Sequence, residues 1–172
     1  GCLSYALAAQ AGAWPQPKGE GLLILQTHYY TSDHYFDADG ARQSQPAFRK
    51  LETQPYVEYG LTEAITLGGS VFLQQVQQSG QVNEGIADPE AFARWTWYRD
   101  AVQVISVQPR VKAPSYFLES GGVRGGSDAM ELEGALLYGR NLTIIDASDY
   151  VDMKSGYRYR HGGLSAQWVN DV

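Results

Sequence analysis

The stretch from Leu51 to Gln74 reads LETQPYVEYGLTEAITLGGSVFLQ and alternates between two rows of residues. From Leu51 to Tyr59, every second residue belongs to a mostly apolar row, while Glu52 and Glu58 belong to a polar row. After a short break at 60–64 the alternation resumes and continues to the end of the stretch. A period of two on both sides of a tight turn predicts a β-hairpin with one apolar and one polar face. The next question is what covers the apolar face.

The same alternation recurs along the chain and predicts about seven strands. Blocks of helix-favouring residues are scarce, so we expect an all-β fold. The expected strands are Leu22–Ser32, Leu51–Tyr59, Ile65–Leu73, Ala91–Arg99, Val102–Lys112, Ala129–Gly139 and Tyr150–Arg160.

The connections between these strands differ in length in a regular way. Those at 60–64 and 99–101 are short, and the one at 140–149 is intermediate. The alternate connections are long and rich in Gly, Asp, Ser and Gln: 33–47, 77–90, 113–128 and the chain from His161 onward. Strands of about ten residues, with short turns at one end and long loops at the other, are typical of a transmembrane β-barrel. We therefore predict an antiparallel up-and-down transmembrane β-barrel.

Charged residues fall on one row only. In an outer-membrane barrel the apolar row meets lipid and the polar row lines the interior, because an Arg or Lys facing lipid at mid-bilayer costs about 2–4 kcal/mol. Charges of both signs fall on neighbouring strands, so cross-strand ion pairs are expected. The residues predicted to line the lumen are Glu52, Glu58, Arg94, Arg110, Glu131, Glu133, Lys154, Arg158 and Arg160.

Aromatic residues gather near both ends of the apolar row. This placement fits aromatic girdles at the two membrane interfaces, where a ring has an apolar and a wet neighbour. The alternative is that these rings pack the core of a soluble barrel. The predicted girdle residues are Tyr29, Tyr59, Trp95, Trp97, Tyr138, Tyr157 and Tyr159.

The N-terminal residues 1–11, GCLSYALAAQA, are small and apolar and close with the sequence Ala-Gln-Ala. They resemble the end of a secretory signal peptide, with cleavage before Gly12. A lipoprotein signal with Cys2 as the lipidated residue is the alternative. We expect 12–20 to be a Pro-rich lead-in and 21–172 to be part of an outer-membrane barrel. Bacterial barrels take an even number of strands, so seven strands indicate a fragment of a larger barrel.

Other functional classes find little support in the sequence. A net charge of −6 and a pI of about 5.0 argue against a nucleic-acid partner. One cysteine permits no intrachain disulfide. The Ser32-Asp33-His34 triplet lacks a nucleophile turn, and Asp37 and Asp39 lack the spacing and distal Glu of a calcium loop. We therefore expect no enzyme activity, no cofactor and no metal site.

Several segments also resemble a known family. They are AGAWPQPKGEG (11–21), YVEYGLTEAITLGG (56–69), SVQPRV (106–111), YGRN (138–141) and GYRYR (156–160). They look like bacterial outer-membrane β-barrel proteins, most closely the group described as putative transporters or as involved in the meta-pathway of phenol degradation. The resemblance runs from about Ala11 to the chain end.

This resemblance implies a monomer in the bacterial outer membrane that contacts the lipid bilayer and passes small, often hydrophobic or aromatic, solutes. It brings no catalytic residues. The sequence predicts a passive channel or transporter. A non-conducting barrel whose outer loops bind a ligand or partner, and a soluble barrel that binds a small ligand, remain alternatives.

Overall fold

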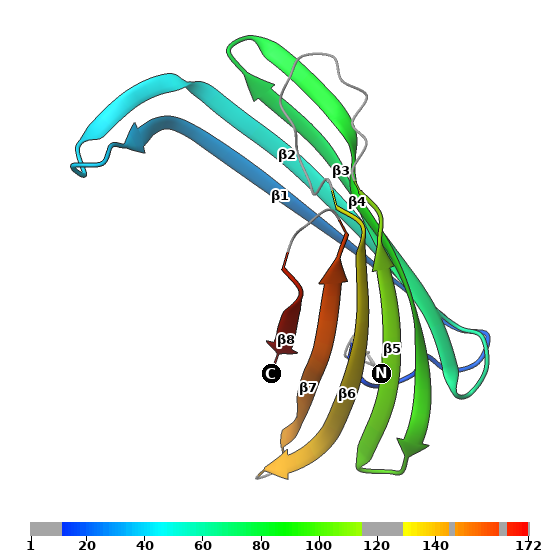
Figure 1. Cartoon of the computed structure of the whole chain (residues 1–172). Helices are drawn as coiled ribbons and strands as arrows, with labels where there is room; N and C mark the ends of the chain where they lie inside the picture. The colour runs from blue at the N-terminus through cyan, green and yellow to red at the C-terminus, as the bar shows by residue number, and fades with distance from the viewer. Residues whose placement is uncertain (1–11, 115–128, 145–146, 162–164, 172) are drawn as a thin grey trace, which may run out of the picture.

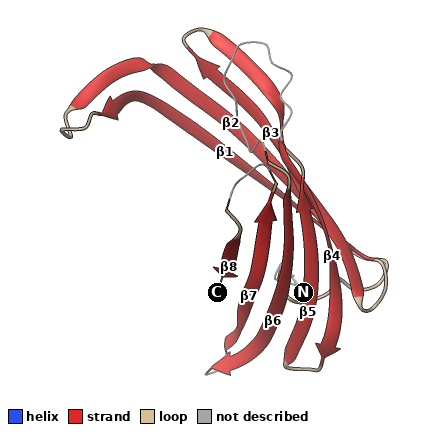
Figure 2. Cartoon of the chain, viewed as in Figure 1, coloured by secondary structure: helices blue, strands red, loops and turns tan. Residues whose placement is uncertain are grey.

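The computed structural model describes residues 12–114, 129–144, 147–161 and 165–171. In this part of the chain all regular structure is β-strand (Figure 2). Eight strands form one antiparallel sheet in chain order (Figure 1). The strands are β1 Gly21–Phe36, β2 Arg42–Gly60, β3 Ile65–Gln78, β4 Gln81–Arg99, β5 Gln103–Lys112, β6 Glu131–Ile144, β7 Ala147–Arg160 and β8 Gln167–Asp171. The sheet is twisted and curled but not closed, with β1 and β8 as its edges.

The stretch that first indicated a hairpin forms one. β2 and β3 pair in antiparallel register, with Glu58 opposite Gly68 and Tyr59 opposite Leu67. The turn between them is fixed locally, because Thr62 Oγ1 accepts hydrogen bonds from the backbone N–H groups of Ala64 and Ile65 at 3.2 and 3.0 Å. The all-β, antiparallel prediction is thereby confirmed.

The predicted long loops at 33–47 and 77–90 are wrong. β1 and β2 extend to a tight turn at 37–41, and β3 and β4 extend to a turn at Ser79–Gly80. Both turn residues have positive φ, 52° and 79°, as a two-residue hairpin turn requires. The β1–β2 and β3–β4 hairpins therefore reach well beyond the ends of the later strands (Figure 1).

Register shifts explain why alternation failed to reveal these extensions. A shift between Ser32 and His34 interrupts the β1–β2 pairing. Another between Ser70 and Phe72 interrupts β3–β4, opposite Asp88, which has a φ of 48°. An extra residue on one strand breaks the period of two. Beyond each shift the sequence pattern resembles that of an irregular polar loop. The residues there are nevertheless paired in strands.

The strand count was also wrong, because the described part of the chain has eight strands and about seven were predicted. Residues 167–171, within the long connection predicted from His161 onward, pair with β7, with Val169 opposite Gly156. The intermediate connection at 140–149 is mostly strand, since β6 continues to Ile144 and β7 begins at Ala147. The predicted signal segment 1–11 and most of the predicted loop 113–128 lie outside the described residues.

The two faces of the sheet differ in the way that the alternation predicts. We call them the polar face, which carries Glu58, Arg94 and Glu133, and the apolar face, which carries Leu25 and Leu136. The polar face is covered, and Glu58 and Arg94 are only 3% and 2% exposed. The apolar face is bare, and Leu25 and Leu136 are 66% and 52% exposed.

One side chain was placed on the wrong face. Thr96 pairs with Ser106, but the register shift at Trp97 makes Tyr98 pair with Ile105 of the apolar row. Strict alternation along the predicted strand Ala91–Arg99 places Tyr98 on the polar row with Arg94 and Thr96, and the register shift moves it to the apolar row. The extra residue Trp97 remains 69% exposed.

Apolar packing inside the curl is small. In the part of the chain that the structure describes, one buried apolar cluster joins Ala13, Val104, Ala135 and Leu137, with Trp14 packed against it. Many of the other buried side chains are polar or charged. Among the described residues, no helix is long and apolar enough to span a membrane. Cross-strand polar contacts, not an apolar core, dominate the covered face.

Candidate functional site

The structure brings the nine predicted lumen residues together on the polar face. Glu52, Glu58, Arg94, Glu131 and Glu133 are buried. Arg110, Lys154, Arg158 and Arg160 are partly buried beside them. They come from β2, β4, β5, β6 and β7, so in-register pairing of consecutive strands is enough to assemble them.

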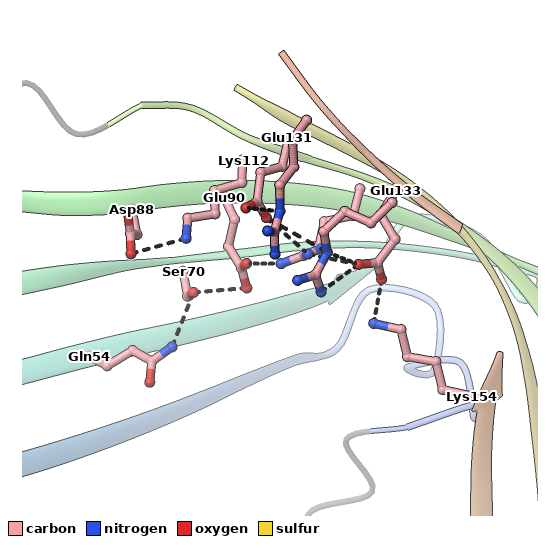
Figure 3. A network of polar contacts seen from close by, with 11 residues as sticks. Gln54, Ser70, Asp88, Glu90, Lys112, Glu131, Glu133 and Lys154 are labelled. Carbon is pink, nitrogen blue, oxygen red and sulfur yellow. Dashed lines mark hydrogen bonds and ion pairs between the residues drawn. The ribbon is translucent and has the colours of Figure 1, made fainter. Parts of the chain in front are cut away.

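Glu133 is the centre of the larger cluster (Figure 3). Its Oε2 atom lies 2.8 Å from Arg110 Nη2 and 2.7 Å from Arg158 Nη2, and its Oε1 atom pairs with Lys154 Nζ. Register is the cause, because Glu133 on β6 is directly opposite Arg110 on β5 and Arg158 on β7. Three cations thus surround one carboxylate whose side chain is 1% exposed.

The cluster continues in both directions across the sheet. On one side Arg110 Nη1 lies 2.6 Å from Glu90 Oε2, and Ser70 Oγ donates to Glu90 at 3.1 Å. On the other side Arg160 Nε lies 3.2 Å from Glu131. This is the network drawn in Figure 3. Charges of both signs are paired along the face, so none of these groups is a bare charge.

Sequence reasoning missed some of the charged residues that form ion pairs on the polar face. Glu90 and Asp88, the partner of Lys112 at 3.0 Å, fell within a predicted loop. Lys50, which pairs with Glu52, lay one residue before the predicted strand. Glu90 and Lys50 each lie two residues before a position already assigned to the polar row. Extending the alternation by one step would therefore have identified both.

A second cluster is centred on the buried pair of Arg94 and Glu58. Arg94 Nη2 donates to Glu58 Oε1 at 2.7 Å, and Arg94 Nε donates to Gln108 at 3.0 Å. Glu58 also accepts from the Tyr56 hydroxyl and from Gln16 Nε2 at 2.8 Å. A buried ion pair is tolerated when further hydrogen bonds satisfy both partners, and both are satisfied here.

Residues 12–18, which we call the N-terminal strap, lie across this second cluster. Arg94 Nη1 donates to the Trp14 carbonyl at 2.8 Å, and Ser106 Oγ donates to the Ala13 carbonyl at 2.7 Å. The Gln16 backbone N–H donates to Thr66 Oγ1 at 2.9 Å. The Pro-rich lead-in is therefore not a loose leader, because it is bonded to β3, β4 and β5.

Two glycines make room for the strap. A Cβ at Gly60 would lie 2.1 Å from the Pro17 carbonyl oxygen. A Cβ at Gly139 would lie 2.7 Å from Trp14 Nε1 and 2.7 Å from Asp152 Oδ1. Such distances are far below van der Waals contact, so a side chain at Gly60 would meet the strap backbone and one at Gly139 would force the Trp14 or Asp152 side chain to shift.

A cavity of about 460 Å³ adjoins the start of the strap. Ile24, Tyr56 and Leu137 contribute apolar surface, while Gln54 and Lys154 contribute polar groups. The space lies on the polar face and is large enough for a small organic molecule.

The predicted aromatic residues lie on the apolar face, and all but one of them are exposed. Tyr138 is half-buried and its hydroxyl donates to Gln103 at 3.3 Å. The others are between 49% and 69% exposed: Tyr29, Tyr59, Trp95, Trp97, Tyr157 and Tyr159.

The turns carry local polar contacts. Asp37 accepts a hydrogen bond from Gln43 Nε2 at 2.8 Å and from the backbone N–H groups of Ala41 and Asp39 at 2.8 and 3.1 Å. These bonds, that of Gln43 first, hold the pKa of its carboxyl below the usual value. His34 contacts Asp33. Within the described ranges, no three His, Cys, Asp or Glu residues are grouped so as to hold a metal ion.

Comparisons of the chain with protein-family models, with characterised proteins and with solved structures find no match. The geometry of the two faces is therefore the main indication of function.

Proposed function

We propose that this chain is part of a bacterial outer-membrane β-barrel whose polar face lines a passage for small solutes. The observation that carries the proposal is the inversion of the two faces. Apolar side chains are bare and charged side chains are covered, which is the reverse of a water-soluble protein.

The apolar face supports a lipid environment. Rows of exposed Leu, Val, Tyr and Trp cover consecutive strands, including Leu23, Leu67, Trp95 and Leu132. Soluble monomers rarely expose contiguous apolar patches beyond a few hundred Å². An apolar outer band flanked by aromatic residues is the lipid-facing surface of a membrane barrel.

Closure of the sheet is part of the proposal. Unpaired backbone groups at the β1 and β8 edges would be strongly unfavourable in lipid. We propose that further strands of the same polypeptide complete a monomeric barrel between these edges. In that barrel the Glu133 and Glu58 clusters face the interior.

The polar face supports passage of solutes by diffusion. Its charges are paired in cross-strand rows, so they form a hydrated wall with a transverse field that orients a polar solute. The 460 Å³ space beside the strap adds apolar surface from Tyr56 and Leu137. That combination favours a small solute with an apolar or aromatic part, in agreement with the family resemblance.

Conductance of the full-length natural protein in planar bilayers tests this function. We expect discrete conductance steps, and faster liposome swelling with small aromatic solutes than with solutes larger than the cavity. A protein that inserts into the bilayer but shows neither conductance nor swelling would contradict the channel.

The strap favours one alternative, a non-conducting barrel. Residues 12–18 occupy part of the polar face and are hydrogen-bonded to β2, β3, β4, β5 and β7. If the barrel does not conduct, deletion of 12–18 should leave it without conductance. Conductance that rises from a measurable level on deletion supports the channel instead.

A further inference from the structure

Asp152 is an acidic side chain on the polar face that lacks a cation. Its Oδ2 atom is buried and has no hydrogen-bond partner. Its Oδ1 atom accepts only a long bond, 3.4 Å, from the Ala13 backbone N–H. An incompletely paired carboxylate in a covered site is unfavourable, so this group calls for an explanation.

The cations on the same face are engaged elsewhere. Arg94 donates to Glu58 at 2.7 Å, and Lys154, two residues along β7 from Asp152, is paired with Glu133. No ion pair joins Asp152 to any residue in the described part of the chain. Neither Arg94 nor Lys154 is therefore an ion-pair partner of Asp152.

The backbone of Gly12 lies directly on this carboxylate. A Cβ at Gly12 would be 2.3 Å from Asp152 Oδ2 and 3.0 Å from Oδ1. The residues that follow are held in place, because the carbonyls of Ala13 and Trp14 accept bonds from Ser106 and Arg94. A positive charge created at Gly12 would be kept beside Asp152.

We propose that the chain is cleaved between Ala11 and Gly12 and that the new α-ammonium group of Gly12 pairs with Asp152. This inference rests on the export that the proposed function requires. A leader peptidase would add water across the 11–12 peptide bond, leaving a carboxylate on Ala11 and an amine on Gly12 that takes up a proton. The residues Ala9-Gln10-Ala11 fit the small-residue preference of such an enzyme.

This pairing explains three features together. It gives Asp152 its missing cation, it requires a residue without a side chain at position 12, and it anchors the free end of the strap. The pair joins the N-terminus to β7, across a sequence separation of 139 residues between Ala13 and Asp152.

The first test is the N-terminal sequence of the full-length protein purified from the outer membrane. We expect Gly12 as the first residue. A protein that begins at Cys2 with a lipid, or at another residue, would overturn the inference while leaving the membrane location intact. A protein absent from the outer membrane would instead overturn the proposed function.

The second test is the rate at which cyanate modifies the Gly12 amine in the folded protein. We expect Asp152→Asn to speed the reaction by roughly tenfold, since a nearby opposite charge favours the unreactive ammonium form. Asp149→Asn, at an exposed position on the same strand, is the matched control and should leave the rate unchanged.

Gly12→Ala provides an independent variant. Its Cβ would push the Asp152 carboxylate aside, so we expect the amine to react as fast as in Asp152→Asn. Equal rates in the wild-type protein, Asp152→Asn and Gly12→Ala would overturn the ion pair even if cleavage occurs before Gly12.

Discussion

At the scale of single residues, Arg94 and Glu58 show how the polar face is held together. The guanidinium joins β4 to β2 through Glu58, to β5 through Gln108, and to the strap through Trp14. Desolvation of two charges offsets much of their attraction, so the pair itself adds little net stability. Loss of one partner is costly, because the other charge is left buried.

Arg94→Ala should therefore lower the free energy of unfolding by about 3–5 kcal/mol, the usual cost of a buried charge without its partner. Arg99→Ala is the matched control, on the same strand but exposed, and should change it by less than about 0.5 kcal/mol. Urea unfolding of the full-length protein in lipid vesicles measures both. A similar, small effect of the two substitutions would contradict the described pairing.

Asp100 holds the turn between β4 and β5 in place. Its titration should make the stability of the protein depend on pH. Its carboxylate accepts the Tyr98 hydroxyl at 2.7 Å and the backbone N–H groups of Val102 and Gln103 at 2.8 Å. These bonds lower the pKa of Asp100 from 3.8 to about 2. Because the folded value is the lower one, the stabilisation is complete above the unfolded pKa and is lost as pH falls toward the folded value.

The difference in urea midpoint between the wild-type protein and Asp100→Ala should be constant from neutral pH to about pH 4 and should narrow toward about pH 2. Thr62→Ala is the control. Its hydroxyl caps the β2–β3 turn and does not titrate, so its midpoint difference should not follow this curve. A difference for Asp100→Ala that stays constant down to pH 2 would refute this role.

At the scale of elements, the N-terminal strap is the least expected part of the structure. Its sequence, with Pro15 and Pro17, predicts only that it is not a central strand. Its contacts are remote in sequence, such as that of Trp14 with Arg94, 80 residues away. Local patterns hold no information about such contacts, so sequence reasoning placed no strap on the polar face.

Gly139→Ala should loosen the strap, because its Cβ would collide with Trp14 and with Val104, 2.9 Å away. Overpacking of this kind costs about 1–3 kcal/mol. Increased quenching of Trp14 fluorescence by aqueous iodide, relative to a Trp14→Phe reference, would report the loosening. Gly134→Ala, on the same strand with open space around it, is the control and should leave quenching unchanged. Equal quenching in both variants would contradict the close packing of Trp14 against Gly139.

The strands themselves were predictable where alternation is unbroken. The rows around Glu52 and Glu58, and around Glu131 and Glu133, alternate cleanly, and the structure buries these four residues on one face of the sheet. Prediction failed where a register shift breaks the period, as beside His34, and where a strand is short and lies at an edge, as in β8. In those places pairing with a neighbouring strand determines the structure, and this pairing cannot be recognised from the local alternation of residues.

At the scale of the whole molecule, the sheet is a curled wall with a bare apolar outside and an ion-paired inside. Its strand order follows the chain, so every pairing between neighbouring strands joins consecutive segments. Such a sheet suits a barrel completed by further strands, and its two faces need two different environments. Proof of those environments would support the proposed function more directly than any stability measurement.

Two neighbouring residues of β1 allow that proof. Leu25 and Gln26 are both exposed but belong to opposite faces, opposite Pro55 and Gln54 of β2. Each is changed to cysteine in full-length protein that carries Cys2→Ser, and the reaction with a charged, membrane-impermeant thiol reagent is followed in outer-membrane vesicles. We predict that Gln26→Cys reacts through the aqueous interior and that Leu25→Cys reacts only after unfolding. Equal reaction of both cysteines in the intact membrane would contradict a lipid-facing apolar row.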